Sequence, residues 1–345
     1  MAMQRNTGFT LIELLVSSII MAIVMIGVFQ SFSVQNENYV IVDQVTEAQQ
    51  NLRAVVDLIE RDVRLAGYMV PRAAAICAHD YDDRPDVLFV SDADKIRTVA
   101  DLEVNAPELM DGNLGVSVQN APPWGPNFSA VDVPTDAAAN PELYVDVAAD
   151  GADFVQNAGL ILVDRNDPEG RVACGQIFSI VGTQLLVNFG PDSQYPNYTP
   201  GIANDVVAIP AHMYQIQPAG GGLPDRLFRD GLLLANDVED LQVVFYIDDN
   251  DDRIVDIGEV FGDGGTPTYA PANLAGIDMT KLREVRVNVV TATSQDDPNQ
   301  NYQFDGANFT FSRGQATANR ALNVPGPDRR RRRLHSATVR LRNLG

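Results

Sequence analysis

An acidic run that follows residue 247 has the residue types and the spacing of a calcium-binding loop. In a twelve-residue calcium loop, positions one, three, five, seven, nine and twelve supply oxygen ligands, position seven through its carbonyl. Counted from Asp248, those positions are Asp248, Asn250, Asp252, Ile254, Asp256 and Glu259. Because Ca²⁺ takes six to eight oxygen ligands in proteins, the spacing predicts one Ca²⁺ site.

Two features of the same run depart from the usual calcium loop. Position six is Arg253, where such loops have a glycine that makes a sharp turn. The run also follows a β-type segment, Leu241–Ile247, so it is not part of a helix–loop–helix pair. The alternative interpretation is a solvated acidic turn in an acidic protein.

Cys77 and Cys174 are the two cysteines of the chain. They are too few for a disulfide scaffold and are not spaced as a metal-binding knuckle. In an oxidising compartment they are the minimum for one bridge, so we predict a Cys77–Cys174 disulfide. The alternative is two buried free thiols.

Sequence signatures of the common enzyme classes are missing. The chain has no GxSxG, no HExxH, no phosphate-binding glycine loop and no dinucleotide fingerprint. His79, His212 and His335 are isolated from one another, and we expect each at a surface or strand position. The sequence therefore predicts a protein that is not an enzyme.

The charge is unevenly distributed between an acidic body and a basic C-terminal region. The chain has 25 basic and 46 acidic residues, a net charge of −21, so we expect no general attraction to nucleic acid. Arg329–Arg333 is an uninterrupted arginine run. DNA capture is one interpretation of this run, but we favour a flexible segment that meets the acidic face of a neighbouring subunit.

The N-terminal segment indicates a membrane anchor. The 21 residues from Phe9 to Phe29 contain a single charge, Glu13, and are long enough for one transmembrane helix. A cleaved signal peptide, cut near Ser31 or Ser33, is the alternative. Glu13 argues against it, because a carboxylate in lipid is costly and indicates a function with a specific partner.

The segment Gly8-Phe9-Thr10-Leu11-Ile12-Glu13 resembles the processing site of type IV prepilins. The resemblance implies that a prepilin peptidase cuts between Gly8 and Phe9 and methylates the new Phe9 amine. It also implies that Glu13, the fifth residue of the mature chain, meets the Phe9 amine of a neighbouring subunit during assembly.

A single long helix is predicted for residues 9–67. No proline precedes Pro71, and Gly27 is the one glycine between residues 9 and 66. Beyond the predicted transmembrane segment 9–29, apolar residues recur every three or four positions from Val45 to Ala66, so one face can pack on a domain. At 1.5 Å per residue the helix is roughly 87 Å long. A membrane anchor with a coiled-coil stalk is the alternative.

After residue 68 the sequence changes to short β-type runs separated by turn residues. Alternation of apolar and polar residues, clearest from Leu282 onward, predicts antiparallel strands with one buried face. The stretches 91–144 and 262–278 are expected to be rich in loops. The predicted strands are 87–91, 160–164, 172–181, 184–189, 206–209, 213–217, 231–235, 241–247, 282–293, 308–312 and 337–342.

Further segments resemble PilW-type minor pilins. The helix closes with Arg61-Asp62-Val63-Arg64-Leu65-Ala66-Gly67-Tyr68, which is similar to that family's helix-closing motif. Residues 238–246 lead into the acidic loop as in the family, and residues 334–343 look like its final strand. The resemblance covers both ends and the middle of the chain.

Together these observations predict an α+β, pilin-like fold. We expect a leader (1–8), a long N-terminal helix (9–67, with 9–29 transmembrane) and a periplasmic α+β domain (68–345), in which the helix packs on an antiparallel β-sheet with large loop insertions.

The resemblance implies a minor pilin that helps start type IV pilus assembly or stays near the tip, anchored by one span in the inner membrane and able to enter the extracellular pilus. Implied partners are other minor and major pilins, the prepilin peptidase and the inner-membrane assembly platform. A minor pseudopilin of type II secretion and a pilus-tip adhesin are the alternatives.

Overall fold

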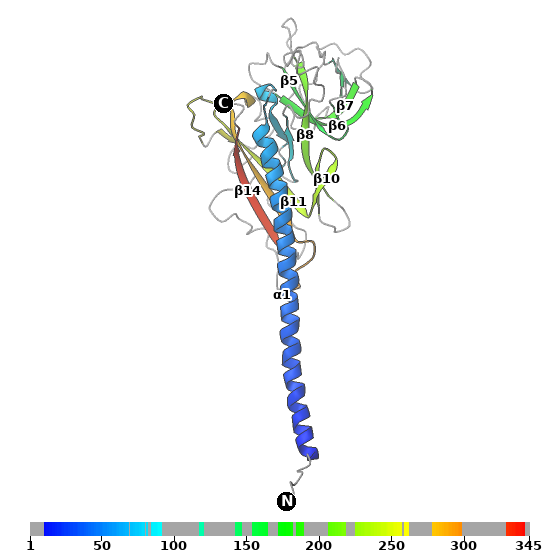
Figure 1. Cartoon of the computed structure of the whole chain (residues 1–345). Helices are drawn as coiled ribbons and strands as arrows, with labels where there is room; N and C mark the ends of the chain where they lie inside the picture. Colours follow the sequence, from blue (N-terminus) through cyan, green and yellow to red (C-terminus); the bar gives the residue numbers. More distant parts are fainter. Residues whose placement is uncertain are drawn as a thin grey trace, which may run out of the picture.

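The structure is a computed structural model of the whole chain. It describes residues 10–68, 70–79, 81, 84–91, 117–120, 142–146, 154–164, 172–181, 184–189, 206–218, 225–256, 259–261, 278–298 and 329–341. Figure 1 shows a long N-terminal helix that carries a β-rich head at its far end.

Helix α1 (Leu11–Leu65) is continuous for 55 residues, about 82 Å at 1.5 Å per residue. It begins at the N-cap Thr10 and ends at Ala66, whose N–H donates to the carbonyls of Asp62 and Val63. Gly67 follows with φ of 79°, a conformation that glycine adopts without strain. The N–H of Gly67 donates to the carbonyl of Ser91, so the turn at the helix end is fixed to the head.

The larger sheet contains ten strands within the described part of the chain, and all its pairings are antiparallel. Its main order is β1-β2-β8-β5-β6-β7-β4-β3; β9 pairs with β8, and β10 pairs with β9. The strands are β1 (Ile76–His79), β2 (Val87–Val90), β3 (Ser117–Asn120), β4 (Glu142–Asp146), β5 (Gly159–Asp164), β6 (Val172–Val181), β7 (Gln184–Asn188), β8 (Val206–Gln217), β9 (Arg226–Arg229) and β10 (Leu232–Asn236).

The smaller sheet has the order β12-β11-β13-β14 and is also antiparallel. Its strands are β11 (Val238–Ile247), β12 (Val260–Phe261), β13 (Leu282–Ala292) and β14 (Arg332–Arg340). The second half of α1 packs against β13 and β14 of this sheet and against β10 of the larger one. Asp86 links the sheets, because its Oδ2 accepts from the N–H of Val243 and its own N–H donates to the carbonyl of Leu241.

Successive side chains of β5 point alternately into two separate apolar cores, one on each face of the larger sheet. Ile161 and Val163 face the main core, which contains the buried side of α1 and both sheets. Leu160 and Leu162 face a smaller cluster with Ile177 and other side chains of the far face. Successive side chains of a strand point to opposite faces, so the larger sheet is buried on both. The predicted α+β, pilin-like fold class is confirmed.

Several strand predictions differ from the structure. Segments 206–209 and 213–217 are one strand, β8, because Pro210 stays in register opposite Leu160. Strand β14 begins at Arg332 rather than Ala337, and β3 lies inside the stretch 91–144 that was expected to be rich in loops. Strands β1, β4, β9 and β12 were not predicted either, and the predicted strand 308–312 lies outside the described residues.

Candidate functional site

The N-terminal end of α1 is organised around Glu13. Thr10 and Glu13 form a reciprocal cap: Glu13 N–H donates to Thr10 Oγ1 (3.4 Å), and Thr10 N–H donates to Glu13 Oε2 (2.9 Å). Thr10 Oγ1 also donates to Glu13 Oε2 (2.8 Å). This capping box turns the Glu13 carboxylate back to Thr10, toward the N-terminal end of the helix. The predicted cleavage residues, Gly8 and Phe9, lie outside the described residues.

The first half of α1 is not covered by any other described part of the chain. Its apolar side chains from Leu11 to Val34 are largely exposed, and the most apolar 18-residue window is 0% buried within the protein. The helix is long and apolar enough to cross a membrane. An exposed apolar surface of this size is typical of a site that contacts a membrane or another protein.

Asp62 fixes the second half of α1 to the head. Its Oδ2 accepts a hydrogen bond from Tyr214 on β8 (2.5 Å) and one from Arg229 on β9 (2.5 Å). Arg61 on α1 donates to Asp62 Oδ1 from its NH2 group (3.1 Å). The Asp62 side chain is 4% exposed, so the carboxylate is almost wholly removed from water. Burial, with the Asp62 charge adding to it, raises the pKa of Tyr214 far above its ordinary value, which keeps the phenol a donor.

The two cysteines lie on neighbouring elements of the head. Cys77 on β1 and Cys174 on β6 are both buried, and the structure joins them in a disulfide. His79, two residues along β1, has its Nε2 2.7 Å from the carbonyl of Cys174. Burial lowers the pKa of His79 to about 4, so the imidazole is neutral at pH 7. The bridge and the histidine hold the edge strand β1 over β6.

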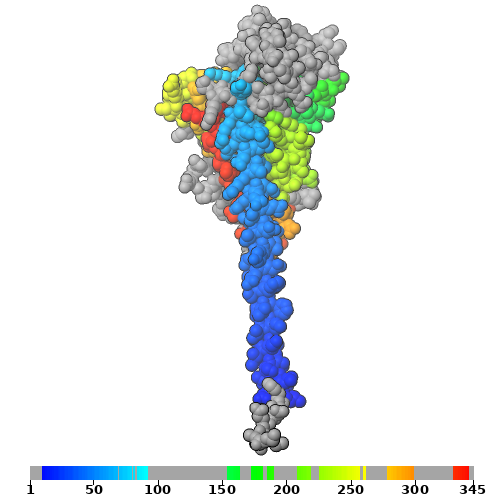
Figure 2. Space-filling model, viewed as in Figure 1, coloured from blue at the N-terminus to red at the C-terminus, as the bar shows by residue number. Residues whose placement is uncertain are grey.

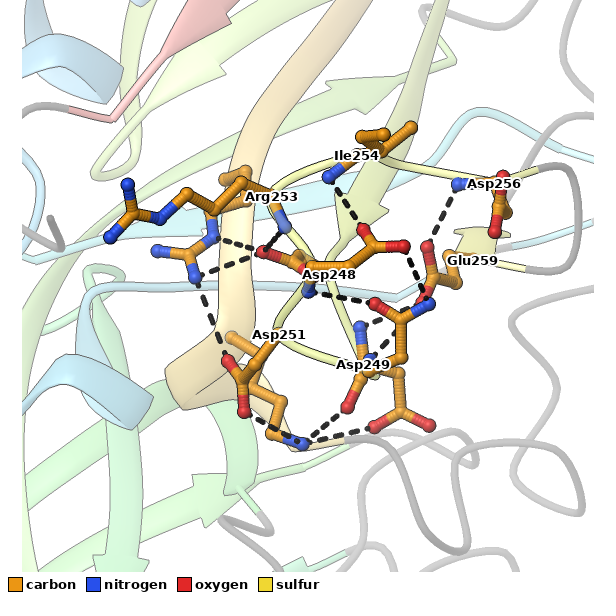
Figure 3. Close-up of polar contacts among 11 residues, drawn as sticks. Asp248, Asp249, Asp251, Arg253, Ile254, Asp256 and Glu259 are labelled. Carbon is orange, nitrogen blue, oxygen red and sulfur yellow. Dashed lines mark hydrogen bonds and ion pairs between the residues drawn. The ribbon is translucent and has the colours of Figure 1, made fainter.

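In the acidic loop after β11, the carboxylates form hydrogen bonds and ion pairs with other groups of the same chain (Figure 3). Asp251 and Arg253 have positive φ angles of 59° and 68°, so Arg253 makes the turn usually made by glycine. Glu259 accepts from the backbone N–H groups of Asp249, Asn250 and Asp256. Backbone donors inside the protein therefore engage both of its carboxylate oxygens.

Two basic side chains, Arg283 and Lys281, contact the acidic loop at residues 248–251. Arg283 on β13 contacts the buried Asp248 Oδ2 from its Nε (3.1 Å) and NH2 (3.0 Å), and Oδ2 also accepts from the N–H of Arg253. Lys281 donates to the carbonyl of Asp249 and lies 3.7 Å from Asp251. Burial opposes the charge of Lys281, but Asp251 and Asp249 outweigh it and raise its pKa.

The donor types fit Ca²⁺, but the carboxylates of the loop are engaged by other groups of the chain. Among the described residues, no three His, Cys, Asp or Glu side chains are placed to hold a metal ion. The physical reason is that Arg283 occupies one oxygen of Asp248 and backbone N–H groups occupy Glu259, while Asn250 and Asp252 bond to each other. Asp248 Oδ1 is buried without a hydrogen-bond partner in this part of the chain. Calcium binding stays a prediction from the sequence.

The arginine run is part of the fold rather than a flexible segment. Arg332, at the start of β14, has a side chain that is 1% exposed and forms a two-point pair with Glu239. Arg331 pairs with the buried Asp297, and Arg329 with Asp296. The expectation of a flexible segment is wrong at these three positions, because acids of the same chain bind them. Contact of the run with a neighbouring subunit stays a prediction.

A membrane-length apolar helix with an acidic cap at its start, continued without a break into an antiparallel β head, defines a pilin-like subunit. Two family models match the chain: the prokaryotic N-terminal methylation motif at residues 3–29, and type IV pilus-assembly protein W (PilW) at residues 225–343. Comparison with curated proteins and with solved structures gave no match. The two matches confirm the resemblance to PilW-type prepilins that the sequence motifs indicated.

Proposed function

We propose that the chain helps to start type IV pilus assembly in a complex with other minor pilins, and that it stays at or near the fibre tip in low copy number. The observation that carries the proposal is the single rod α1, whose uncovered apolar half is rigidly joined to a broad head. The uncovered half needs neighbouring helices, and the head spreads to both sides of α1 (Figure 2). Because heads exclude one another, such a width limits close packing of identical subunits.

We further propose the location and processing that this role requires. The helix anchors the precursor in the inner membrane, the head is periplasmic, and prepilin peptidase cuts between Gly8 and Phe9 before the assembly platform moves the subunit into a fibre. The matched methylation motif over residues 3–29 supports this order. Mass spectrometry of membrane-extracted protein is expected to find N-methyl-Phe9. A mature terminus near Ser33 would instead identify a signal peptide.

The decisive experiment is a pull-down of the intact, tagged subunit from cross-linked membranes. We expect smaller prepilin-type proteins to co-purify, and we expect deletion of the gene to remove surface fibres. Absence of every pilin-like protein from the purified material would contradict the proposal. Loss of protein secretion with normal fibres would identify a pseudopilin, and normal fibres that no longer bind cells would identify an adhesin.

A further inference from the structure

Strand β10 ends one side of the larger sheet, beside α1. It pairs with β9 along one edge, and no described strand pairs with the other. Its sequence, Leu-Leu-Leu-Ala-Asn, contains no charge, and Leu232 and Leu233 are 75% and 50% exposed. A free strand edge with exposed apolar side chains is a template for pairing with another strand.

Three other strands that end a sheet, β14, β12 and β1, are protected in ways that β10 is not. Strand β14 places exposed Arg333 and Arg340 on its edge, and β12 is only two residues long. Strand β1 is buried along its whole length. Charged side chains, short length and burial are the usual means by which proteins prevent edge pairing. Within the described residues, β10 has none of these three protections, so its second edge can pair with a partner strand.

The turn before β10 holds the exposed leucines in a fixed position. Asp230 Oδ1 accepts from the N–H of Met213 (2.9 Å), and Asp230 Oδ2 lies 2.6 Å from Nδ1 of His212. Gly231 has φ of 77°, and a Cβ at this position would lie 2.6 Å from the Cβ of Asn157. The hairpin is thus packed against the head, and little conformational entropy is lost when a partner binds its edge.

The position of β10 indicates which partner reaches it. Figure 2 shows the β9–β10 hairpin along one flank of α1 and β14 along the other, and α1 contacts both. Arg229 on β9 binds Asp62 on α1, so hairpin and helix are one unit. A neighbour whose own anchor packs along the exposed half of α1 has its helix roughly parallel to α1 in the same membrane. Its head then meets this head at the height of β10.

We propose that the free edge of β10 binds an extended strand of another membrane-anchored, pilin-like subunit, which adds to the sheet and covers Leu232 and Leu233. Main-chain hydrogen bonds supply part of the binding energy and the two leucines supply an apolar contact. This inference rests on the proposed function for the identity of the neighbour as a pilin-like subunit.

The test uses the full-length protein in its own membrane with a photo-cross-linking phenylalanine analogue at Leu232. Thr338, an exposed position on the protected strand β14, is the matched control site. We expect a cross-link from position 232 to a pilin-like subunit and little or none from position 338. Cross-links from 232 only to lipid or only within the chain, or equal cross-linking from 338, would overturn the inference.

A second measurement adds charge to the edge. Leu232→Lys/Leu233→Lys is compared with Val181→Lys, since Val181 on β6 is 72% exposed and away from β10. We expect the double variant to keep its melting temperature and to lose about tenfold in co-purifying pilin, as for loss of a central contact. Equal pilin recovery from both variants would overturn the β10 inference and leave the proposed function intact. No pilin recovery from the wild-type chain would overturn both.

Discussion

Removal of the Asp62 carboxylate tests whether one buried group holds the pilin helix to its head. Asp62→Ala leaves Tyr214 and Arg229 without their shared acceptor, and Arg229 Nε already lacks a partner among the described residues. Breaking a buried ion pair from one side costs about 3–5 kcal/mol. Because the Arg229 side chain is 23% exposed and water screens part of its charge, we expect the lower end, about 3 kcal/mol.

Two further variants divide this cost between charge and hydrogen bonding. Asp62→Asn keeps an acceptor for Tyr214 but removes the charge that Arg229 needs, so we expect a loss of about 2 kcal/mol. Tyr214→Phe removes one hydrogen bond to a charged group, which is worth about 1.5–3 kcal/mol. Asp57→Ala is the matched control, since Asp57 is an exposed acid on the same helix and surface changes stay within about 0.5 kcal/mol.

The assay is thermal unfolding of the full-length protein in detergent, with the disulfide intact. A loss of about 3 kcal/mol corresponds to a fall in Tm of roughly 6–12 °C at the scale of 150–250-residue proteins. Limited proteolysis is expected to cut the Asp62→Ala variant between α1 and β8 sooner than the control. If Asp62→Ala and Asp57→Ala melt within 2 °C of each other, on the order of 1 kcal/mol or less, the reasoning is refuted.

Three other outcomes are expected. Glu13→Ala and Glu13→Gln are both expected to be processed and to enter fibres poorly, because neither keeps the carboxylate charge. Gln does keep the cap with Thr10, so normal incorporation of the Gln variant alone would show that only the cap matters. Normal incorporation of both variants would refute the role of Glu13. The folded-state pKa of His79, about 4, lies below its unfolded value near 6.5. The neutral His79 therefore contributes about 3 kcal/mol to the free energy of unfolding above pH 6.5, and this contribution is lost as the pH falls toward 4. His79→Gln should flatten the dependence of Tm on pH, and an unchanged slope would contradict this prediction. For a dissociation constant of about 1 mM, about 5 mM Ca²⁺ stabilises by roughly 1 kcal/mol. The rise in Tm with Ca²⁺ should be larger in Arg283→Gln, which frees Asp248, and absent in Asp248→Asn. If Ca²⁺ raises the Tm of no variant, the loop is an acidic turn whose charges are neutralised within the chain, and the calcium prediction is wrong.

Local sequence patterns were sufficient for the helix, because its determinants are close together along the chain. The absence of proline before Pro71 and the spacing of apolar residues up to Ala66 predicted a continuous rod, and α1 follows it to Leu65. The final strand was predicted from alternation after Ala337 but begins five residues earlier. The first part of this strand was not predicted because it contains arginines. A run of arginines is typical of a solvated segment unless acids from elsewhere in the chain pair with it.

The contacts that join the helix to the head could not be predicted, because the partners are distant in sequence. Asp62 is separated by 152 residues from Tyr214 and by 167 from Arg229. A signal was present: Asp62 is next to Val63 and three positions after Ile59, on the apolar side of the helix, where an acid needs a buried partner. In the acidic loop, Arg283 reaches Asp248 from another strand, a contact that a local sequence pattern cannot predict.

The unbroken path from Thr10 to Asp62 gives the anchor and the head a fixed rotational phase. Successive residues of an α-helix are separated by about 100° of rotation and 1.5 Å of rise. Since α1 has no internal break and Asp62 prevents it from turning against β8 and β9, the direction that the head faces is set by the number of residues between membrane and head. One residue inserted after Ser33 would turn the whole head by about 100° relative to the anchor while raising it by only about 1.5 Å. The number of residues in this helix therefore sets the direction in which the head faces as well as its distance from the membrane. It also sets which side of the head a neighbour in the same membrane meets.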